Sequence, residues 1–267
     1  MKRFFAFGCS YTSYFYPTWA DFIGSNFDEY YNYGQAGSGN RYIFNSIIEA
    51  NIIHKFTKDD VIFIQWSGVE RTDKHINNAW KLQVHQNRSY MTEWLNFKDK
   101  LLELMNYMTI LKDLFDLKGI SYKFLMLTNI DADYNTFTKE NCLEVKDFYK
   151  DTVNLLYPGF HDVLTDNRDR PVTIAGKKIF DGHHFPWEQY DYVKKFFPEY
   201  LPKISNLREK LIEIYEQAID IDLDEIDQNV AFERCEWPIK IKGVRLAHNK
   251  FSLLHPPKQI IKDKNNE

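Results

Sequence analysis

Short apolar segments with strand character alternate with amphipathic segments of helical period along the first two hundred residues. This alternation limits the fold more than any other feature of the chain. Strands are expected at residues 3–7, 29–33, 61–66 and 122–127, with a strand or short hairpin at 172–180. Helices are expected at residues 18–26, 41–55, 92–117, 139–155 and 187–200. Strands that alternate with helices pair in parallel and are covered by helices on both faces. The sequence therefore predicts an α/β three-layer sandwich around a central, mainly parallel five-stranded sheet.

Two segments lie outside this alternation. Residues 67–91 are polar and without strong periodicity, so we expect them to form a surface excursion. Toward the C-terminus, a predicted helix at 205–217 is followed by the acidic stretch 220–227 and a tail that contains prolines. We therefore divide the chain into a main domain at 1–203 and a C-terminal helical and irregular extension at 204–267. The extension is expected to pack on the domain or on a neighbouring copy of the chain in a homo-oligomer.

Charge and cysteine content exclude several classes of protein. The formal net charge is -4, which argues against a nucleic-acid partner, because such proteins usually carry a basic face. Cys9, Cys142 and Cys235 are widely spaced, so neither a disulfide framework nor a zinc site is expected, and a reducing compartment fits best. No apolar stretch approaches the roughly 20 residues that cross a bilayer, and the apolar run at the N-terminus stops at Gly8. We expect a cytoplasmic protein without a membrane span and without a cofactor.

A serine follows the first predicted strand directly. Gly8 ends that strand, and Ser10 comes two residues later in the segment Cys9-Ser10-Tyr11-Thr12. Ligands of open parallel sheets bind beyond the carboxyl ends of the strands. A serine on a sharp turn at that edge has an exposed hydroxyl, and its backbone N–H is free to face an oxyanion. Ser10 is therefore a candidate nucleophile, and Cys9 is expected to be buried beneath the turn.

An aspartate and a histidine arrive together just before the helix expected at 187–200. Asp181 precedes His184 by three residues, so its carboxylate can accept a hydrogen bond from the imidazole Nδ1–H and leave Nε2 facing a nucleophile. A serine hydroxyl needs such a base. His183 is the competing base, and Asp181, His183 and His184 together are an alternative metal site. The other histidines are expected to have surface or packing roles: His54, His75, His85, His161, His248 and His255.

These two segments resemble blocks of the SGNH (GDSL-type) hydrolase superfamily, which includes esterases, lipases, thioesterases and carbohydrate acetylesterases. Gly8-Cys9-Ser10 is similar to the first block, Gly-Asp-Ser, with cysteine in place of aspartate. Asp181 to His184 matches the last block, Asp-X-X-His. The resemblance covers roughly residues 3–200. It implies a flavodoxin-like sheet and a catalytic triad of Ser10, Asp181 and His184.

The resemblance also implies where the oxyanion hole lies. Asn32-Tyr33-Gly34-Gln35-Ala36-Gly37 is similar to the second block, which makes the N–H of Gly37 a donor beside that of Ser10, with Gly39 as the fallback. The third block departs from the family, which typically has Gly-X-Asn-Asp there. This chain has Gln65-Trp66-Ser67-Gly68-Val69-Glu70-Arg71, without an asparagine. The hydroxyl of Ser67 is the expected replacement donor, and Arg71 is expected to contact the substrate or the oxyanion. Because loss of one donor costs about 100- to 1,000-fold in turnover, this replacement matters.

Taken together, the residues and the resemblance indicate a serine esterase that works through an acyl-serine intermediate. An O-acetyl group on a carbohydrate suits the polar second loop and the aromatic residues expected near the site, which are Tyr11, Tyr14, Tyr16, Trp66 and Trp187. Transfer of the acyl group to a sugar hydroxyl is a close alternative, because it shares the same intermediate. A non-catalytic glycan-binding or scaffold protein is the alternative from another class. Further substrate contacts are expected from Tyr11, Gly39, Asn40, Trp66, Arg71 and His183.

Overall fold

The computed structural model describes residues 2–76, 79–84, 97–131, 139–164, 172–174, 177–179, 185–219, 235–239 and 244–245. Its strands are β1 (Arg3–Gly8), β2 (Glu29–Gly34), β3 (Val61–Trp66), β4 (Arg71–Ile76), β5 (Ala79–Val84), β6 (Ser121–Met126), β7 (Leu156–Tyr157), β8 (Val172–Ile174), β9 (Lys177–Ile179) and β10 (Val244–Arg245). Its helices are α1 (Trp19–Gly24), α2 (Asn40–His54), α4 (Phe97–Lys118), α6 (Lys139–Phe148), α7 (Lys150–Val153), α8 (Phe160–Val163), α9 (Pro186–Phe196) and α10 (Leu207–Ile219), with a 3₁₀ turn at Pro198–Tyr200.

The central sheet has the strand order β10-β2-β1-β3-β6-β7, and every pair in it is parallel. Without β10, the order is the flavodoxin-like arrangement of five strands. The predicted α/β class and parallel five-stranded sheet are confirmed. The fifth strand is β7, which lies in a stretch where the sequence predicted only a helix. Within the segment expected to be a strand or short hairpin, β8 and β9 pair antiparallel with each other and form a separate two-stranded sheet, so this segment adds no strand to the main sheet.

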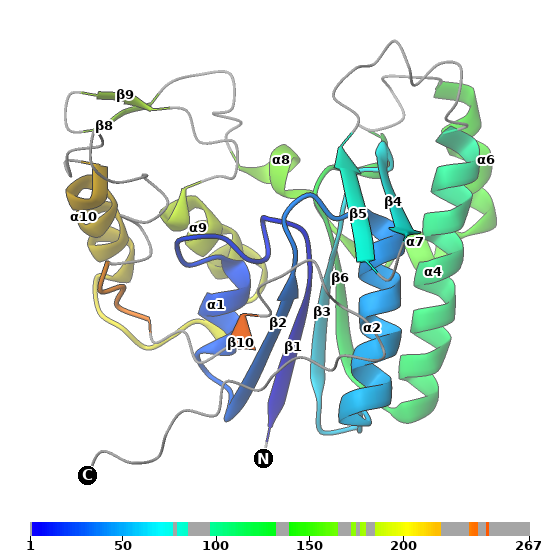
Figure 1. Ribbon diagram of the computed structural model, residues 1–267, viewed down its shortest axis with the longest axis horizontal. Coiled ribbons are helices and arrows are strands. Elements are labelled where there is room, and N and C mark those ends of the chain that lie inside the picture. The colour runs from blue at the N-terminus through cyan, green and yellow to red at the C-terminus, as the bar shows by residue number, and fades with distance from the viewer. Residues whose placement is uncertain are drawn as a thin grey trace.

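Helices cover both faces of this sheet, as Figure 1 shows. On one face, α2 and α4 enclose an apolar cluster that contains Phe7, Ile64 and Met105. On the other face, α1, α9 and α10 enclose a second cluster that contains Phe4 and Phe63. The strands are buried on both sides, which explains why they read as apolar runs rather than as an alternation of apolar and polar residues.

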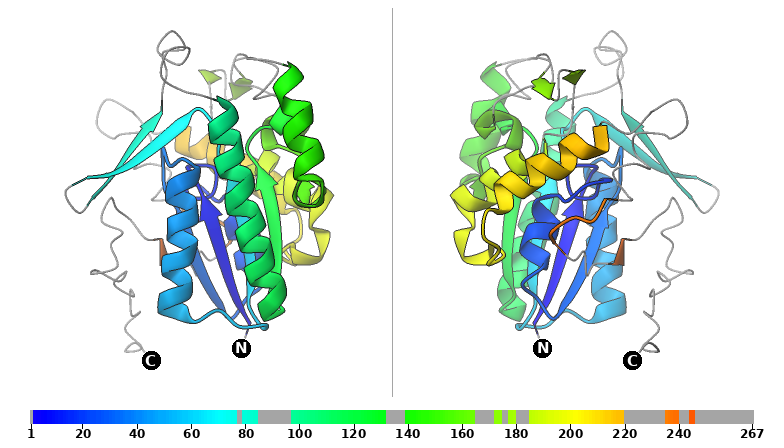
Figure 2. Two further views of the ribbon diagram at one scale, coloured as in Figure 1. Left: turned by 90° about the vertical axis from the view of Figure 1, so that its right-hand side faces the viewer. Right: turned by 90° about the vertical axis from the view of Figure 1, so that its left-hand side faces the viewer.

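Two parts of the fold were only partly visible in the sequence. The polar excursion contains the antiparallel hairpin β4–β5, which extends sideways from the molecule in Figure 2. β4 is polar except for its last residue, but in β5 the apolar residues Trp80, Leu82 and Val84 alternate with Lys81 and Gln83, a strand signal that the reading of this segment as a polar excursion overlooked. In the extension 204–267, the described residues pack on the domain: Leu207, Leu211 and Tyr215 of α10 are buried in the second cluster, and β10 pairs with β2. The division of the chain at residue 203 and the homo-oligomer stay predictions.

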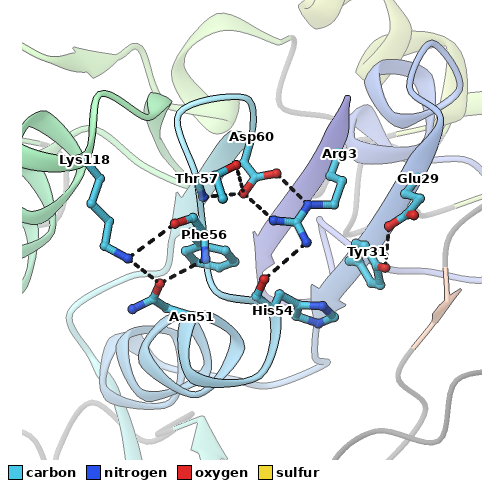
Figure 3. Close-up of polar contacts among 9 residues, drawn as sticks. All are labelled: Arg3, Glu29, Tyr31, Asn51, His54, Phe56, Thr57, Asp60 and Lys118. Atoms are coloured by element: carbon cyan, nitrogen blue, oxygen red, sulfur yellow. Dashed lines mark hydrogen bonds and ion pairs between the residues drawn. The ribbon is translucent and has the colours of Figure 1, made fainter. Parts of the chain in front are cut away.

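A polar network closes the amino end of the sheet (Figure 3). Arg3 donates from Nε and Nη2 to the two carboxylate oxygens of Asp60, at 2.7 and 2.6 Å, and from Nη1 to the His54 carbonyl at 3.2 Å. Nearby, Lys118 Nζ donates to Asn51 Oδ1 at 3.1 Å. This network holds the start of β1 against the loop that leads from α2 to β3, so the opposite, carboxyl end of the sheet is the end left for a ligand. Within the described residues, no helix combines the length and apolar character of a membrane span.

Candidate active site

Ser10 lies on a tight turn at the carboxyl end of β1. The N–H groups of Thr12 and Ser13 both donate to the Cys9 carbonyl, at 3.0 and 3.3 Å, so Ser10 and Tyr11 occupy the middle of the turn. Thr12 Oγ1 donates to Gln65 Oε1 of β3 at 2.9 Å, which anchors the turn to the neighbouring strand. Ser10 is 5% exposed, and Cys9 is fully buried against Tyr11 and Leu127, as expected for a packing residue beneath the turn.

The second loop is bonded to the same strand end. Gln35 N–H and Ser38 Oγ both donate to the Gly8 carbonyl at 3.0 Å. A turn closed by the bond from Ser38 N–H to the Gln35 carbonyl places Gly37 at a φ of 78°, which favours glycine because it has no Cβ. The fold therefore brings Gly37, the expected oxyanion donor, into a loop attached directly to the strand that carries Ser10. Its role stays a prediction.

The segment after β3 is bonded to the start of α2. Ser67 N–H donates to Asn40 Oδ1 at 2.8 Å, and Asn40 Nδ2 donates back to the Ser67 carbonyl at 3.0 Å. Ser67 is fully buried, and its Oγ has no hydrogen-bond partner within the described part of the chain. Asn40, which the sequence placed among the substrate contacts, thus holds the backbone of the predicted oxyanion residue. Trp66 is fully buried in the core against Phe124, which favours packing over the predicted contact with substrate.

Two charged residues of β4, Asp73 and Arg71, bond to the second loop and the start of α2. Asp73 accepts hydrogen bonds from the N–H groups of Gly39 at 2.8 Å and Tyr42 at 2.9 Å, so it caps α2 from 34 residues away. Burial raises the pKa of Asp73, and the two N–H bonds oppose this increase. Because its N–H is engaged by Asp73, Gly39 is a poor fallback for the oxyanion hole. Arg71 donates from Nη1 to the Ser38 carbonyl at 3.2 Å, so it supports the second loop.

The predicted base and its partners, Asp181, His183 and His184, lie outside the described residues. The helix that follows them, α9, is described from its first turn. Gln189 of that turn accepts a hydrogen bond from the N–H of Trp19 at 3.0 Å, and Trp19 begins α1. The start of α9 therefore lies beside the start of α1. The connection from β1 to α1 is the one that carries the serine turn. Among the described side chains, no three of His, Cys, Asp or Glu form a metal-binding group.

His161, for which the sequence suggested a surface or packing role, packs against the ring of Tyr11 in the serine turn. It lies in α8, and its N–H donates to the Leu127 carbonyl at the end of β6. Its Nε2 is 2.8 Å from the hydroxyl of Tyr11, next to Ser10. A recognisable strand before α8 would have placed His161 at the carboxyl end of the sheet. However, β7 has only two residues, which is too short to show a strand periodicity in the sequence.

The aromatic residues around the site are less available to a ligand than the sequence suggested. Four of the five aromatic residues expected near the site are buried: Tyr11, Tyr16, Trp66 and Trp187. Trp187 stacks on Phe185 with ring centroids 4.5 Å apart, and it meets the edge of Tyr215 from α10. These rings join the extension to the domain. Tyr14 is half-buried, and its ring makes edge contacts with Phe15 and Tyr16.

Comparison with known proteins finds no matching family model and no matching curated protein. Among solved structures, the chain is similar to a member of the lipolytic protein G-D-S-L family from Veillonella parvula, with 13% identity and a TM-score of 0.43, over 74% of this chain and 99% of that chain. It is also similar to a mutant of Axe2, an acetyl-xylooligosaccharide esterase from Geobacillus, with 14% identity and a TM-score of 0.41, over 74% of this chain and 93% of that chain. At these values, the likeness does not assign a function.

Proposed function

We propose that this chain is a serine esterase of the SGNH type, which hydrolyses a carboxylic ester through an acyl intermediate on Ser10. The observation that carries the proposal is the meeting of three loops at the carboxyl end of the parallel sheet. The turn that bears Ser10, the loop that bears Gly37 and the segment that bears Ser67 are joined there by two buried hydrogen bonds and one that is partly buried. The flavodoxin-like strand order and the sequence blocks that resemble the superfamily support the same assignment.

In the proposed mechanism, His184 takes the proton from the Ser10 hydroxyl as its oxygen attacks the acyl carbonyl. Asp181 orients the imidazole and stabilises its charged form. The alcohol leaves with the proton that His184 returns, and the acyl group stays on Ser10. A water molecule, deprotonated by His184, then attacks the acyl-serine. The bond between the acyl carbon and Ser10 Oγ breaks, His184 returns the proton to Oγ, and the acid is released.

The negative charge that develops on the carbonyl oxygen needs donors placed in advance. The backbone N–H groups of Ser10 and Gly37 are two of them. The Ser67 hydroxyl is the third, because it is buried at the end of β3 and has no other partner in the described part of the chain. Each such donor contributes about 100- to 1,000-fold to turnover, so three donors are sufficient for an active esterase despite the missing asparagine.

We propose an O-acetylated carbohydrate as the substrate. The second loop offers a polar, partly exposed surface at Gln35 and Gly37, and Tyr14 is a half-buried ring on the loop that follows Ser10. A long acyl chain would need a wide apolar approach to the turn. Hydrolysis of p-nitrophenyl esters of increasing chain length tests the acyl group, and release of acetate from acetylated oligosaccharides tests the alcohol. Faster hydrolysis of octanoate than of acetate would contradict the choice of substrate.

Covalent labelling with a fluorophosphonate probe tests the nucleophile. We expect the wild-type protein to be labelled and Ser10→Ala to be unlabelled, while Ser13→Ala, three residues along the same loop, is labelled like the wild type. Absence of labelling in the wild type, or equal labelling of Ser10→Ala, would contradict the proposal and favour a non-catalytic binding protein. A sugar acceptor that diverts the acetyl group from water would favour the acyltransferase.

A second comparison tests the base. His184→Gln is expected to lose at least about 1,000-fold in the turnover of p-nitrophenyl acetate, as expected for loss of a triad member. The neighbouring substitution His183→Gln is the matched control, and we expect it to stay within about tenfold of the wild type. The reverse ranking would assign the base to His183.

A further inference from the structure

A buried hydroxyl without a partner is rare in a folded protein, and Ser67 has one. Its Oγ makes no hydrogen bond with any described residue, although Ser67 is fully buried. Two other side-chain donors of the same segment, Gln65 Nε2 and Arg71 Nε, also lack a hydrogen-bond partner among the described residues, although Arg71 Nε lies 3.9 Å from Glu70 Oε1 in an ion pair. Most buried polar groups in native structures are hydrogen-bonded, and the exceptions usually have a functional reason. At the carboxyl end of β3, this buried donor lacks a partner among the described residues, so a ligand group that reaches it can accept its hydrogen bond.

The backbone of Ser67 is held by a single side chain. The amide of Asn40 pairs with both backbone groups of Ser67, with its oxygen accepting from the N–H at 2.8 Å and its nitrogen donating to the carbonyl at 3.0 Å. Asn40 itself is 9% exposed and is the first residue of α2. Two hydrogen bonds to one residue define the rotation of its backbone, and with it the direction of the Cα–Cβ bond.

The start of α2 is held in turn from three directions. Asp73 accepts from the N–H groups of Gly39 and Tyr42, on either side of Asn40. Arg71 donates to the Ser38 carbonyl, and Ser38 Oγ donates to Gly8, at the end of the strand that carries the nucleophile. Asn40 therefore sits on a rigid support that connects it to β1, and a group positioned by rigid neighbours is held more accurately than one on a free loop.

We propose that Asn40 is a positioning residue for the Ser67 hydroxyl. The asparagine that the third block lacks is replaced by two residues: Ser67 supplies the donor to the oxyanion, and Asn40, the first residue of α2, sets its direction. This inference rests on the proposed esterase function, and it makes a claim of its own. Asn40 acts on turnover only through Ser67, without touching the substrate.

A double-mutant cycle on turnover tests this claim. The variants are Ser67→Ala, Asn40→Asp and the double variant, assayed as full-length protein with p-nitrophenyl acetate. Asn40→Asp is nearly isosteric, still accepts from the Ser67 N–H, and replaces the donor to the Ser67 carbonyl with an oxygen. The matched control is Asn45→Asp, on the exposed side of the same helix, where Asn45 Nδ2 donates to the Arg41 carbonyl at 2.8 Å.

The expected loss is in kcat rather than in KM. Ser67→Ala should lower kcat about 100-fold, and Asn40→Asp about 10-fold or more, with KM within about twofold of the wild type. Added to Ser67→Ala, the Asn40 substitution should change kcat by less than about twofold, because the group that it positions is already absent. Asn45→Asp should match the wild type. A thermal melt of each variant reports whether the protein is folded, and Asn40→Ser replaces Asn40→Asp in the cycle if that variant does not fold.

Three results would overturn the inference. Losses in kcat that multiply in the double variant would mean that Asn40 acts directly or through the fold as a whole. A rise in KM with unchanged kcat would make Asn40 a substrate contact, as the sequence first suggested. If the wild type is neither labelled by a fluorophosphonate nor active on any ester, the esterase function fails and the positioning role fails with it. That outcome is distinct from an active wild type whose variants lose activity independently.

Discussion

Replacing Asp73 with alanine tests whether β4 holds the second loop in place. The carboxylate accepts two backbone N–H bonds at the start of α2, from Gly39 at 2.8 Å and Tyr42 at 2.9 Å. A hydrogen bond to a charged group contributes about 1.5–3 kcal/mol, so the two together contribute about 3–6 kcal/mol. Burial of the carboxylate, which raises its pKa, offsets part of this contribution. We therefore expect Asp73→Ala to lower the free energy of unfolding by about 2–4 kcal/mol.

Urea unfolding followed by tryptophan fluorescence measures this change. With a slope of about 3 kcal/mol per molar urea, the midpoint should fall by about 1 M. The control is Asp113→Ala on α4, whose carboxylate is 70% exposed and pairs with Lys112 at 3.4 Å. It should change stability by less than about 0.5 kcal/mol.

Hydrogen exchange gives the local readout for the same substitution. The amides of Gly39 and Tyr42 should exchange faster in Asp73→Ala, because they lose their acceptor. If Asp73→Ala is no less stable than the Asp113 control, or if these two amides keep their protection, the capping of α2 by β4 is wrong.

Three further substitutions test other parts of the fold. Gly8→Ala would place a Cβ 2.0 Å from Thr12 Oγ1, so thermal unfolding should show a loss of about 1–3 kcal/mol, and an unchanged melting temperature would contradict the close approach. Asp60→Asn weakens the bidentate ion pair with Arg3, and urea unfolding should show that the free energy of unfolding falls by about 2 kcal/mol. A smaller loss than that of a surface variant would mean that the network contributes little to stability. Burial raises the pKa of Glu49 to about 7, so ionisation of its carboxyl group in the folded state opposes folding. The free energy of unfolding should therefore fall by about 1–3 kcal/mol as the pH rises from about 5 to about 8. Stability profiles against pH should show this decline in the wild type and not in Glu49→Gln, and parallel profiles would refute the assignment.

Much of the main sheet could be predicted because its signals are local. Residues 3–7 and 61–66 are apolar runs of strand length, and Gly8 marks the end of the first strand. The position of Ser10 on a turn at the carboxyl edge follows from these two facts. The short strands β7 and β10 could not be predicted, because two residues carry no periodicity and pair only where the sheet already offers an edge.

The contacts that define the candidate site depend on residues far apart in the chain. Asn40 pairs with Ser67, Asp73 caps the helix that begins at Asn40, and His161 meets Tyr11 across 150 positions. Nothing in the sequence within a few positions of these residues indicates which distant residues they contact. The sequence placed Asn40 among the substrate contacts, and the fold adds its pairing with Ser67. His161, expected to have a surface or packing role, packs against Tyr11.

By itself, then, the sequence determined the parallel α/β architecture and the place of Ser10 on its turn. The spacing of apolar residues and a glycine at the end of a strand are signals that can be read from a few neighbouring residues. Only the tertiary structure decided which side chains support that turn. The sheet brings the ends of β1, β2 and β3 side by side, and close packing then selects which distant polar groups can satisfy each other's hydrogen bonds. The Ser67 hydroxyl, which that selection leaves without a hydrogen-bond partner among the described residues, is a product of the fold and not of the local sequence.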